Sequence, residues 1–188
     1  MRVLVAEDET VIRLDLQGLL QGAGFDVVGA ARDGEEAVEL ARSECPDLAI
    51  LDVKMPRLDG IDAARKILHD RPIPIVMLTA YDEEDLVARA IEVGVFAYLV
   101  KPFREQDLVP AIHAARARFS ELQALRDEAD SLAEALEARK AIERAKGILM
   151  EKEGLTEAEA FVRLRTASQT SGRTMKFIAE ALVQAFDG

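Results

Sequence analysis

The sequence contains very little cysteine, no tryptophan and no long apolar run. Its 188 residues include a single cysteine, so no disulfide can form within the chain, which fits the reducing cytosol. The longest apolar runs, such as 93–100, are far shorter than the roughly 20 residues that cross a bilayer. The run 3–6 is too short for the core of a signal peptide. We therefore expect a cytoplasmic protein without a membrane partner.

Positive charge is also scarce, and it is unevenly distributed. The chain has a formal net charge of −11. Residues 1–118 carry −8, residues 119–138 carry −5, and residues 139–188 carry +2. An acidic N-terminal part followed by a weakly basic end predicts that a polyanionic partner would bind the C-terminal part.

Short apolar runs alternate with amphipathic segments throughout residues 1–118. The expected strands are 3–6, 27–30, 48–51, 73–78 and 96–100, and the expected helices are 10–20, 35–42, 61–69, 82–93 and 106 to about 118. Five strand–helix repeats predict an α/β fold, a doubly wound five-stranded parallel sheet. Near-continuous apolar strands predict that helices cover both faces of this sheet.

The most informative strand is 48–51, because it ends at a carboxylate, Asp52. Ligands of such sheets bind at the carboxyl ends of the strands. The other strands end in Glu7-Asp8-Glu9, in Thr79-Ala80 and in Lys101-Pro102. We expect these strand ends to converge in space although they lie far apart in the sequence.

The residue types at these strand ends indicate phosphoryl transfer. Several carboxylates around one point repel one another, so a divalent cation is needed, and oxygen ligands favour Mg²⁺ or Mn²⁺. Such a cation also neutralises and aligns a phosphoryl group for attack by a carboxylate, for which Asp52 is the candidate. Lys101 can pair with Asp52 or with a phosphoryl oxygen. The Thr79 hydroxyl can donate a hydrogen bond to another oxygen.

Residues 1–118 resemble the flavodoxin-like receiver domain of two-component response regulators. The resemblance rests on Glu7-Asp8, Asp52, Met55-Pro56, Asp59-Gly60, Thr79-Ala80, Tyr98 and Lys101-Pro102. It implies that a cognate histidine kinase phosphorylates Asp52. It also implies the metal ligands, which are Asp8 and Asp52 directly, Glu7 through water, and the backbone carbonyl of Lys54. Thr79 and Tyr98 would be the residues that change position on activation. Glu7 stands where many relatives carry Asp, and we expect metal binding to be retained.

The segment 116–140 contains no proline and no glycine. Leucine and alanine recur three and four residues apart in it, at Leu122, Leu125, Ala129, Leu132 and Leu136. This heptad pattern predicts a coiled-coil-like helical linker at 119–138 that continues the last receiver helix. Two interpretations stay open at this point. The stripe forms a parallel homodimer, or it packs on one of the chain's own domains.

Residues 139–188 are expected to form a three-helix bundle. The first helix ends at Gly154, and Thr156 with Glu159 forms a capping box for the second. Thr174 can cap the third helix. Apolar faces are predicted for the last two helices, with Ala160, Phe161, Leu164 and Ala167 on the second and Phe177, Ile178, Ala181, Leu182 and Ala185 on the third.

This C-terminal stretch resembles the ANTAR domain, an RNA-binding antiterminator module. The matching residues are Ala145-Lys146-Gly147, Leu149-Met150, Ala160-Phe161, Leu164-Arg165, Ala167 and Ala179. The resemblance implies binding to paired RNA hairpins near a transcription terminator. Phosphate charge supplies much of such affinity, and side chains contact splayed loop bases. The candidate RNA contacts are Arg144, Lys146, Arg165, Arg173 and Lys176.

The main hypothesis is a response regulator that is phosphorylated on Asp52 and acts as an antiterminator. One alternative is a DNA-binding response regulator with a helix-turn-helix. Its recognition helix would be 174–186, which carries Lys176 but also Glu180 and is mostly apolar. Another alternative is a metal-dependent enzyme that acts on a small phosphoester, although no substrate domain is evident. We expect no metabolic activity beyond slow dephosphorylation of Asp52.

Overall fold

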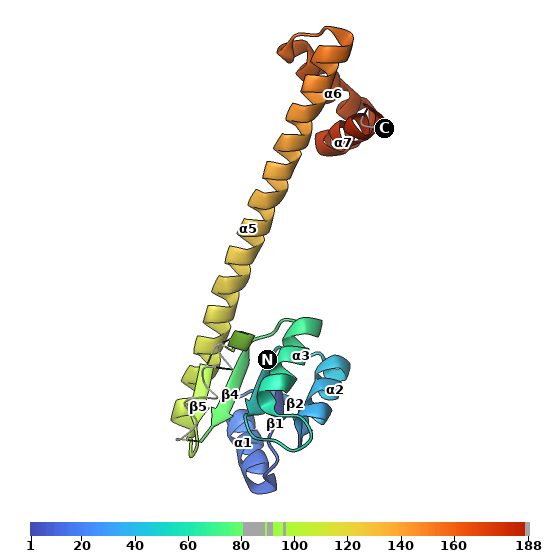
Figure 1. Cartoon of the computed structure of the whole chain (residues 1–188). Helices are drawn as coiled ribbons and strands as arrows, with labels where there is room; N and C mark the ends of the chain where they lie inside the picture. The colour runs from blue at the N-terminus through green and yellow to red at the C-terminus, as the bar shows by residue number, and fades with distance from the viewer. Residues whose placement is uncertain (81–88, 90–91, 96, 187–188) are drawn as a thin grey trace. The chain divides into compact units, whose positions relative to one another are not determined.

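The computed structural model describes residues 1–80, 89, 92–95 and 97–186 of the chain (Figure 1). The chain divides into two compact units, residues 1–123 and residues 124–188. Each unit has its own hydrophobic core, so each is described by itself. Among the described helices, none combines the length and the apolar composition needed to cross a bilayer.

The first unit is built on one five-stranded sheet. Its strands are β1 (Arg2–Ala6), β2 (Asp26–Ala31), β3 (Leu48–Asp52), β4 (Ile75–Thr79) and β5 (Ala97–Val100). They lie in the order β2-β1-β3-β4-β5, and every pair is parallel. The predicted doubly wound parallel sheet is therefore confirmed. β4 begins at Ile75 rather than at the expected residue 73, because Pro74 has no N–H to donate to a neighbouring strand.

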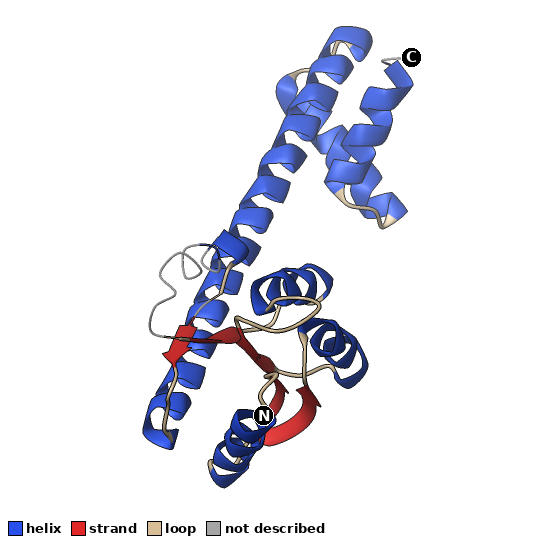
Figure 2. Cartoon of the chain, turned by 60° about the horizontal axis from the view of Figure 1, so that its bottom comes forward, coloured by secondary structure: helices blue, strands red, loops and turns tan. Residues whose placement is uncertain are grey.

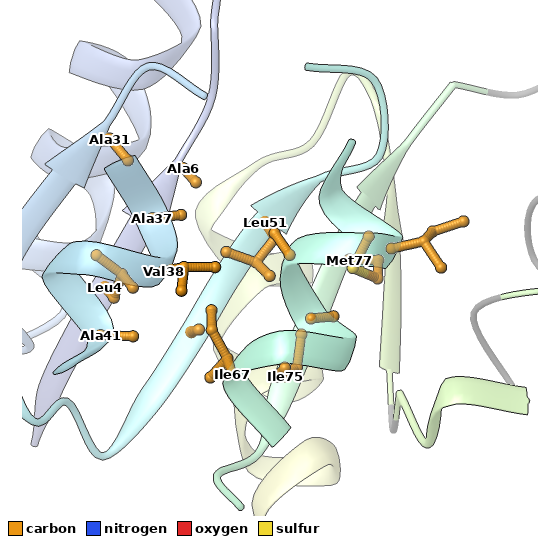
Figure 3. Close-up of a cluster of buried hydrophobic side chains, with 14 of the residues drawn as sticks. Leu4, Ala6, Ala31, Ala37, Val38, Ala41, Leu51, Ile67, Ile75 and Met77 are labelled. Atoms are coloured by element: carbon orange, nitrogen blue, oxygen red, sulfur yellow. The ribbon is translucent and has the colours of Figure 1, made fainter. Parts of the chain in front are cut away.

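Helices cover both faces of the sheet (Figure 2). Helices α2 (Gly34–Glu44) and α3 (Gly60–Asp70) pack on one face, where the side chains labelled in Figure 3 include Leu4, Leu51 and Met77. Helix α1 (Thr10–Gly22) and the first turns of α5 (Glu105–Glu153) pack on the other face. Val3 and Val5 point to the second core while Leu4 and Ala6 point to the first, as expected for a strand buried on both sides.

Two aspartates begin the helices of the first face. Asp33 accepts hydrogen bonds from the N–H groups of Glu35 and Glu36 at the start of α2, both at 3.0 Å. Asp59 accepts one from the N–H of Asp62 at 2.7 Å at the start of α3. These caps satisfy backbone donors that have no partner within the helix. The helix predicted over 82–93 lies largely outside the described residues, as does residue 96 of the last predicted strand.

Helix α5 (Glu105–Glu153) is continuous over 49 residues. It includes the expected last receiver helix, the linker segment and the first helix of the C-terminal bundle. The absence of glycine from this segment up to Gly147 and of proline after Pro110 explains this continuity. The side chains of Leu125, Leu132 and Leu136 are more than half exposed.

The second unit contains the end of α5 with α6 (Glu157–Ser171) and α7 (Met175–Phe186). The predicted capping box is present, with the Thr156 N–H donating to Glu159 Oε2 at 2.9 Å. The core consists of small and aliphatic side chains, namely Ala145, Leu149, Ala160, Leu164 and Ala179, with Ile178 and Leu182 packed against them. The predicted three-helix bundle is confirmed.

The predicted apolar faces of α6 and α7 are correct only in part. Phe161 and Phe177 are 41% and 50% exposed, and Ala167, Ala181 and Ala185 are exposed as well. The core of small residues is filled without the aromatic rings, so these positions stay on the surface. An apolar residue type therefore did not by itself predict burial here.

Candidate functional site

Three carboxylates meet at the carboxyl edge of the sheet. Glu7 follows β1, Asp8 comes next, and Asp52 ends β3. Each offers an oxygen, and these oxygens all lie within 4.8 Å of one another. Glu7 is fully buried and Asp52 is 5% exposed, whereas Asp8 is exposed. The structure thus brings together the acids that the strand ends suggested, with the exposed Asp8 at the solvent side of the cluster.

Lys101 supplies a positive charge to this cluster. Its Nζ lies 2.8 Å from Asp52 Oδ1 and 2.7 Å from Glu7 Oε2. The Lys101 N–H donates to the carbonyl of Thr79 at 2.9 Å, which anchors the lysine backbone to the end of β4. Glu7 Oε2 is buried and has no hydrogen bond of regular geometry among the described residues, so its contact with Lys101 is an ion pair only. One cation for three acids leaves the cluster short of positive charge.

The protonation behaviour of Asp52 reflects this shortage. Burial raises the pKa of Asp52 from 3.8 to about 6, the hydrogen bond from Lys101 opposes this rise, and the negative charges of Glu7 and Asp8 add to it. Burial by itself lowers the pKa of Lys101, but its interactions with Asp52 and Glu7 together outweigh that effect, and the net pKa is raised. Lys101 is therefore charged at neutral pH, while ionised Asp52 is held at an energetic disadvantage that an additional cation would remove.

The loop between β3 and α3 is tightly fixed behind Asp52. The Gly60 N–H donates to the Val53 carbonyl at 2.9 Å, and a Cβ on Gly60 would lie 1.9 Å from the Asp52 carbonyl oxygen. The Gly34 N–H donates to the Leu58 carbonyl at 3.2 Å. This loop carries the backbone carbonyl of Lys54, the remaining predicted metal ligand.

An ion pair that no sequence pattern indicated also holds this loop. Arg57 has a left-handed backbone with φ of 65°, and its guanidinium pairs with Asp33, which is 1% exposed. A non-glycine residue in this conformation is uncommon, and nothing in the sequence marked it. The pairing joins the start of α2 to the loop beside the acidic cluster.

The residues present fit a hard divalent cation. The donors are carboxylate oxygens, one of them a buried oxygen without a regular hydrogen bond, and a backbone carbonyl stands in the adjacent loop. Mg²⁺ and Mn²⁺ prefer such oxygen ligands. The donor set thus suits either metal and contains no soft ligand that would favour zinc or copper.

Thr79 lies on the strand next to that of Asp52, and Tyr98 lies one strand further along the sheet. Thr79 ends β4 and is 3% exposed, and its hydroxyl donates to the Ala80 carbonyl at 3.1 Å. Tyr98 lies in β5 and packs against the α2–α3 core, and its partial burial raises the pKa of the phenol. Both side chains come from strands that pair directly with one another.

The five candidate RNA contacts of the second unit occupy two kinds of environment. Arg144, Arg165 and Arg173 are exposed and Lys176 is partly so. Lys146 is 7% exposed, and its Nζ lies 3.0 Å from Glu143 Oε2 and 2.6 Å from Glu157 Oε1. These bonds raise the pKa of Lys146, with Glu157 the larger cause. Four of the five are thus accessible to a polyanion, while the fifth is occupied within the bundle.

Family comparison assigns both units. Residues 3–113 match the response regulator receiver domain, and residues 130–183 match the ANTAR domain. The second match does not favour a helix-turn-helix in the C-terminal unit.

Individual relatives agree with this assignment. Transcriptional regulatory protein PdtaR of Mycobacterium tuberculosis is 53% identical over 183 residues, which are 97% of this chain and 89% of the relative. The receiver domain of a modulated diguanylate cyclase from Desulfovibrio desulfuricans matches with a TM-score of 0.60 at 32% identity, over 63% of this chain and 95% of that one. A response regulator receiver domain protein from Clostridium thermocellum matches with a TM-score of 0.59 at 34% identity, over 64% of this chain and 98% of that one. The chain belongs to the response regulator family, with a receiver domain followed by an ANTAR domain.

Proposed function

We propose that this response regulator is a phosphorylation-controlled transcription antiterminator. A cognate histidine kinase phosphorylates Asp52 in the receiver domain, and the ANTAR domain binds RNA hairpins near a terminator. The observation that carries the proposal is the buried Asp52 carboxylate beside Glu7, Asp8 and Lys101, on the same chain as an ANTAR domain. We assign residues 1–118 to the receiver, 119–138 to the linker and 139–188 to the RNA-binding domain.

In the proposed phosphotransfer, an Asp52 oxygen attacks the phosphorus of a phosphohistidine. The new O–P bond forms as the N–P bond breaks, and the electron pair of that bond returns to the imidazole. Mg²⁺ or Mn²⁺, held by Asp8, Asp52, the Lys54 carbonyl and, through water, Glu7, would neutralise the phosphoryl oxygens. Lys101 pairs with a phosphoryl oxygen. Hydrolysis of the O–P bond later releases inorganic phosphate and restores the carboxylate, and this slow step is the proposed limit of the enzymatic activity.

The phosphoryl group then shifts the receiver between two conformations. The Thr79 hydroxyl donates to a phosphoryl oxygen in the active state, and Tyr98 turns inward behind it. Helix α5 begins in the receiver unit and ends in the ANTAR unit, which makes it the proposed relay. A phosphoryl group can shift this equilibrium only by interacting better with one state than with the other.

Dimerisation through residues 119–138 is part of the proposal. Three of the four leucines of this stripe are exposed, Leu125 to 57%, Leu132 to 64% and Leu136 to 53%. Heptad spacing of this kind is typical of a helix that packs against a second copy. Two copies would also double the basic surface offered to the RNA.

We further propose a cytoplasmic location, as expected for a partner of nascent RNA.

Phosphodonor labelling followed by RNA titration tests the proposal. Acetyl phosphate with Mg²⁺ should add one phosphoryl group to the wild-type mass, and the Asp52→Asn variant should stay unlabelled while keeping its fold. A two-hairpin RNA should then bind more tightly to the labelled protein in a gel-shift titration. Labelling of the Asn variant would show that another acid is the acceptor. Equal RNA affinity with and without the phosphodonor would contradict the switch.

Light scattering on the same samples tests the dimer. The expected mass is that of two chains for the phosphorylated protein. The Leu132→Glu variant should have the mass of one chain, since the substitution places a charge within the stripe. A mass of one chain for the phosphorylated wild type would contradict the proposed dimer without affecting the labelling result.

A further inference from the structure

An aromatic ring and a guanidinium lie together at the surface where α6 turns into α7. The guanidinium carbon of Arg173 lies 5.3 Å from the centre of the Phe177 ring. Phe177 is 50% exposed, whereas its neighbours Ile178 and Ala179 belong to the bundle core. A half-exposed phenylalanine under a cation contributes little to a core, so it is a candidate for contact with a partner.

Backbone bonds hold both residues in place before any partner binds. The Ser168 hydroxyl donates to the Arg173 carbonyl at 2.6 Å, and the Arg173 N–H donates to the Ser171 hydroxyl at 3.4 Å. The Phe177 N–H donates to the Thr174 hydroxyl at 3.3 Å, which caps α7. These bonds fix the backbone that carries the ring and the guanidinium, so less backbone order has to be gained on binding, and they leave both groups available to a partner.

Exposed guanidiniums in the second unit, one of them Arg173 over the ring, favour an anionic partner over an apolar protein surface. Arg165 and Arg173 are both exposed, and neither has a carboxylate partner among the described residues. Lys146 and Lys176, by contrast, are paired with glutamates. Two uncompensated guanidiniums on one small unit would be costly to bury against an apolar face, but they complement phosphates.

The combination of an exposed ring, a stacked guanidinium and uncompensated positive charge matches the chemistry of an unpaired nucleobase. Unpaired bases of RNA loops stack on aromatic side chains and on guanidinium planes, while their phosphates pair with arginine. We infer that Phe177 and Arg173 form a stacking platform for one unpaired loop base of the RNA. This inference rests on the proposed RNA-binding function and assigns a residue, Phe177, that contributes no charge.

Alanine substitution at Phe177 tests the platform against a matched control on the same helix. The phosphorylated full-length protein is titrated with a two-hairpin RNA. Phe177→Ala should weaken binding about tenfold, within the range known for the loss of one stacked base. Phe186, which is 52% exposed, has the same residue type and similar exposure, and Phe186→Ala should change affinity by less than about twofold. Equal affinity of Phe177→Ala and the wild type would overturn the inference.

Two further measurements separate stacking from general packing. Phe177→Leu keeps an apolar side chain of similar size without a π face, so it should lose most of the affinity that Phe177→Ala loses. Full affinity of the Leu variant would overturn stacking as the mechanism. A 2-aminopurine placed at each loop position in turn should show quenched fluorescence at one position with the wild type and not with either variant. The thermal unfolding midpoint of each variant monitors folding.

The outcome also distinguishes this inference from the function on which it rests. If the wild type binds no hairpin RNA, the antiterminator proposal fails and the platform with it. If the wild type binds loop-containing RNA and Phe177→Ala binds it equally well, only the platform is wrong.

Discussion

Two lysines in this chain each lie between two carboxylates, and the burial is arranged in opposite ways. In the receiver unit, the side chain of Lys101 is 20% exposed, and the side chains of its partners Glu7 and Asp52 are 0% and 7% exposed. In the ANTAR unit, Lys146 is 8% exposed, and its partners Glu143 and Glu157 are 57% and 70% exposed. The two lysines therefore have similar partners and very different surroundings.

The difference shows how burial turns an ion pair into a reactive site or a structural contact. Around Lys101 the acids are buried, so water cannot screen their charge, and the pKa of Asp52 is raised. Around Lys146 the acids face water, and the hydrogen bond from the lysine lowers the pKa of Glu157. A further cation would stabilise the first cluster, whereas the exposed acids of the second cluster are already solvated by water.

Removing the positive charge at Lys101 should produce the largest effect. Lys101→Met should lower the rate of labelling by acetyl phosphate by about 10²-fold or more, because a preorganised charge at the transferring phosphoryl group is lost. Initial rates from intact-protein mass spectra measure this change. Lys146→Met is the matched control and should be labelled at the wild-type rate. Similar rates for both variants would remove the distinction between the two clusters.

The next largest effect is the pH dependence of stability without metal. The folded state raises the pKa of Asp52 from 3.8 to about 6, so it binds this proton more tightly than the unfolded chain does. The resulting stability is fully present below pH 3.8 and is lost as the pH rises through about 6. A shift of this size corresponds to about 3 kcal/mol. Urea unfolding in EDTA should show this loss in the wild type.

The variant Asp52→Asn is the reference for that measurement. It has no proton to lose at this position, so its stability should exceed that of the wild type above the transition. The two proteins should converge at acid pH. If the unfolding free energies of the wild type and Asp52→Asn ran parallel against pH, Asp52 would not be the group whose pKa is raised by burial.

The smallest effect concerns Lys146, which was predicted to contact RNA. Its two glutamate partners favour a positioning role at the junction of α5 and α6. Arg165→Ala should reduce the slope of log affinity against log salt by about one, as expected for a lost phosphate contact. Lys146→Met should leave this slope unchanged and lower the unfolding midpoint less than the core change Leu149→Ala does. A reduced slope in Lys146→Met would restore it as an RNA contact.

The sheet and the acidic edge could be predicted from sequence because parallel strands place their carboxyl ends together. The alternation of apolar strands with amphipathic helices was therefore enough to predict that Glu7, Asp8 and Lys101 lie at the same edge of the sheet as Asp52. The Arg57–Asp33 pair could not be predicted, since it depends on a left-handed residue and on two loops far apart in the sequence. The exposure of Phe177 was missed for a similar reason. Its spacing was that of a core residue, but small side chains already fill the bundle.

The close approach of Gly60 to the carbonyl of Asp52 predicts which mutations abolish signalling. The position of Asp52, the proposed phosphoacceptor, depends on the absence of a side chain at residue 60, since a Cβ on Gly60 would lie 1.9 Å from the Asp52 carbonyl oxygen. A genetic screen for loss of signalling should therefore recover substitutions of Gly60, although this residue has no side-chain functional group. Such variants would keep Glu7, Asp8 and Asp52 and still not be phosphorylated by the kinase.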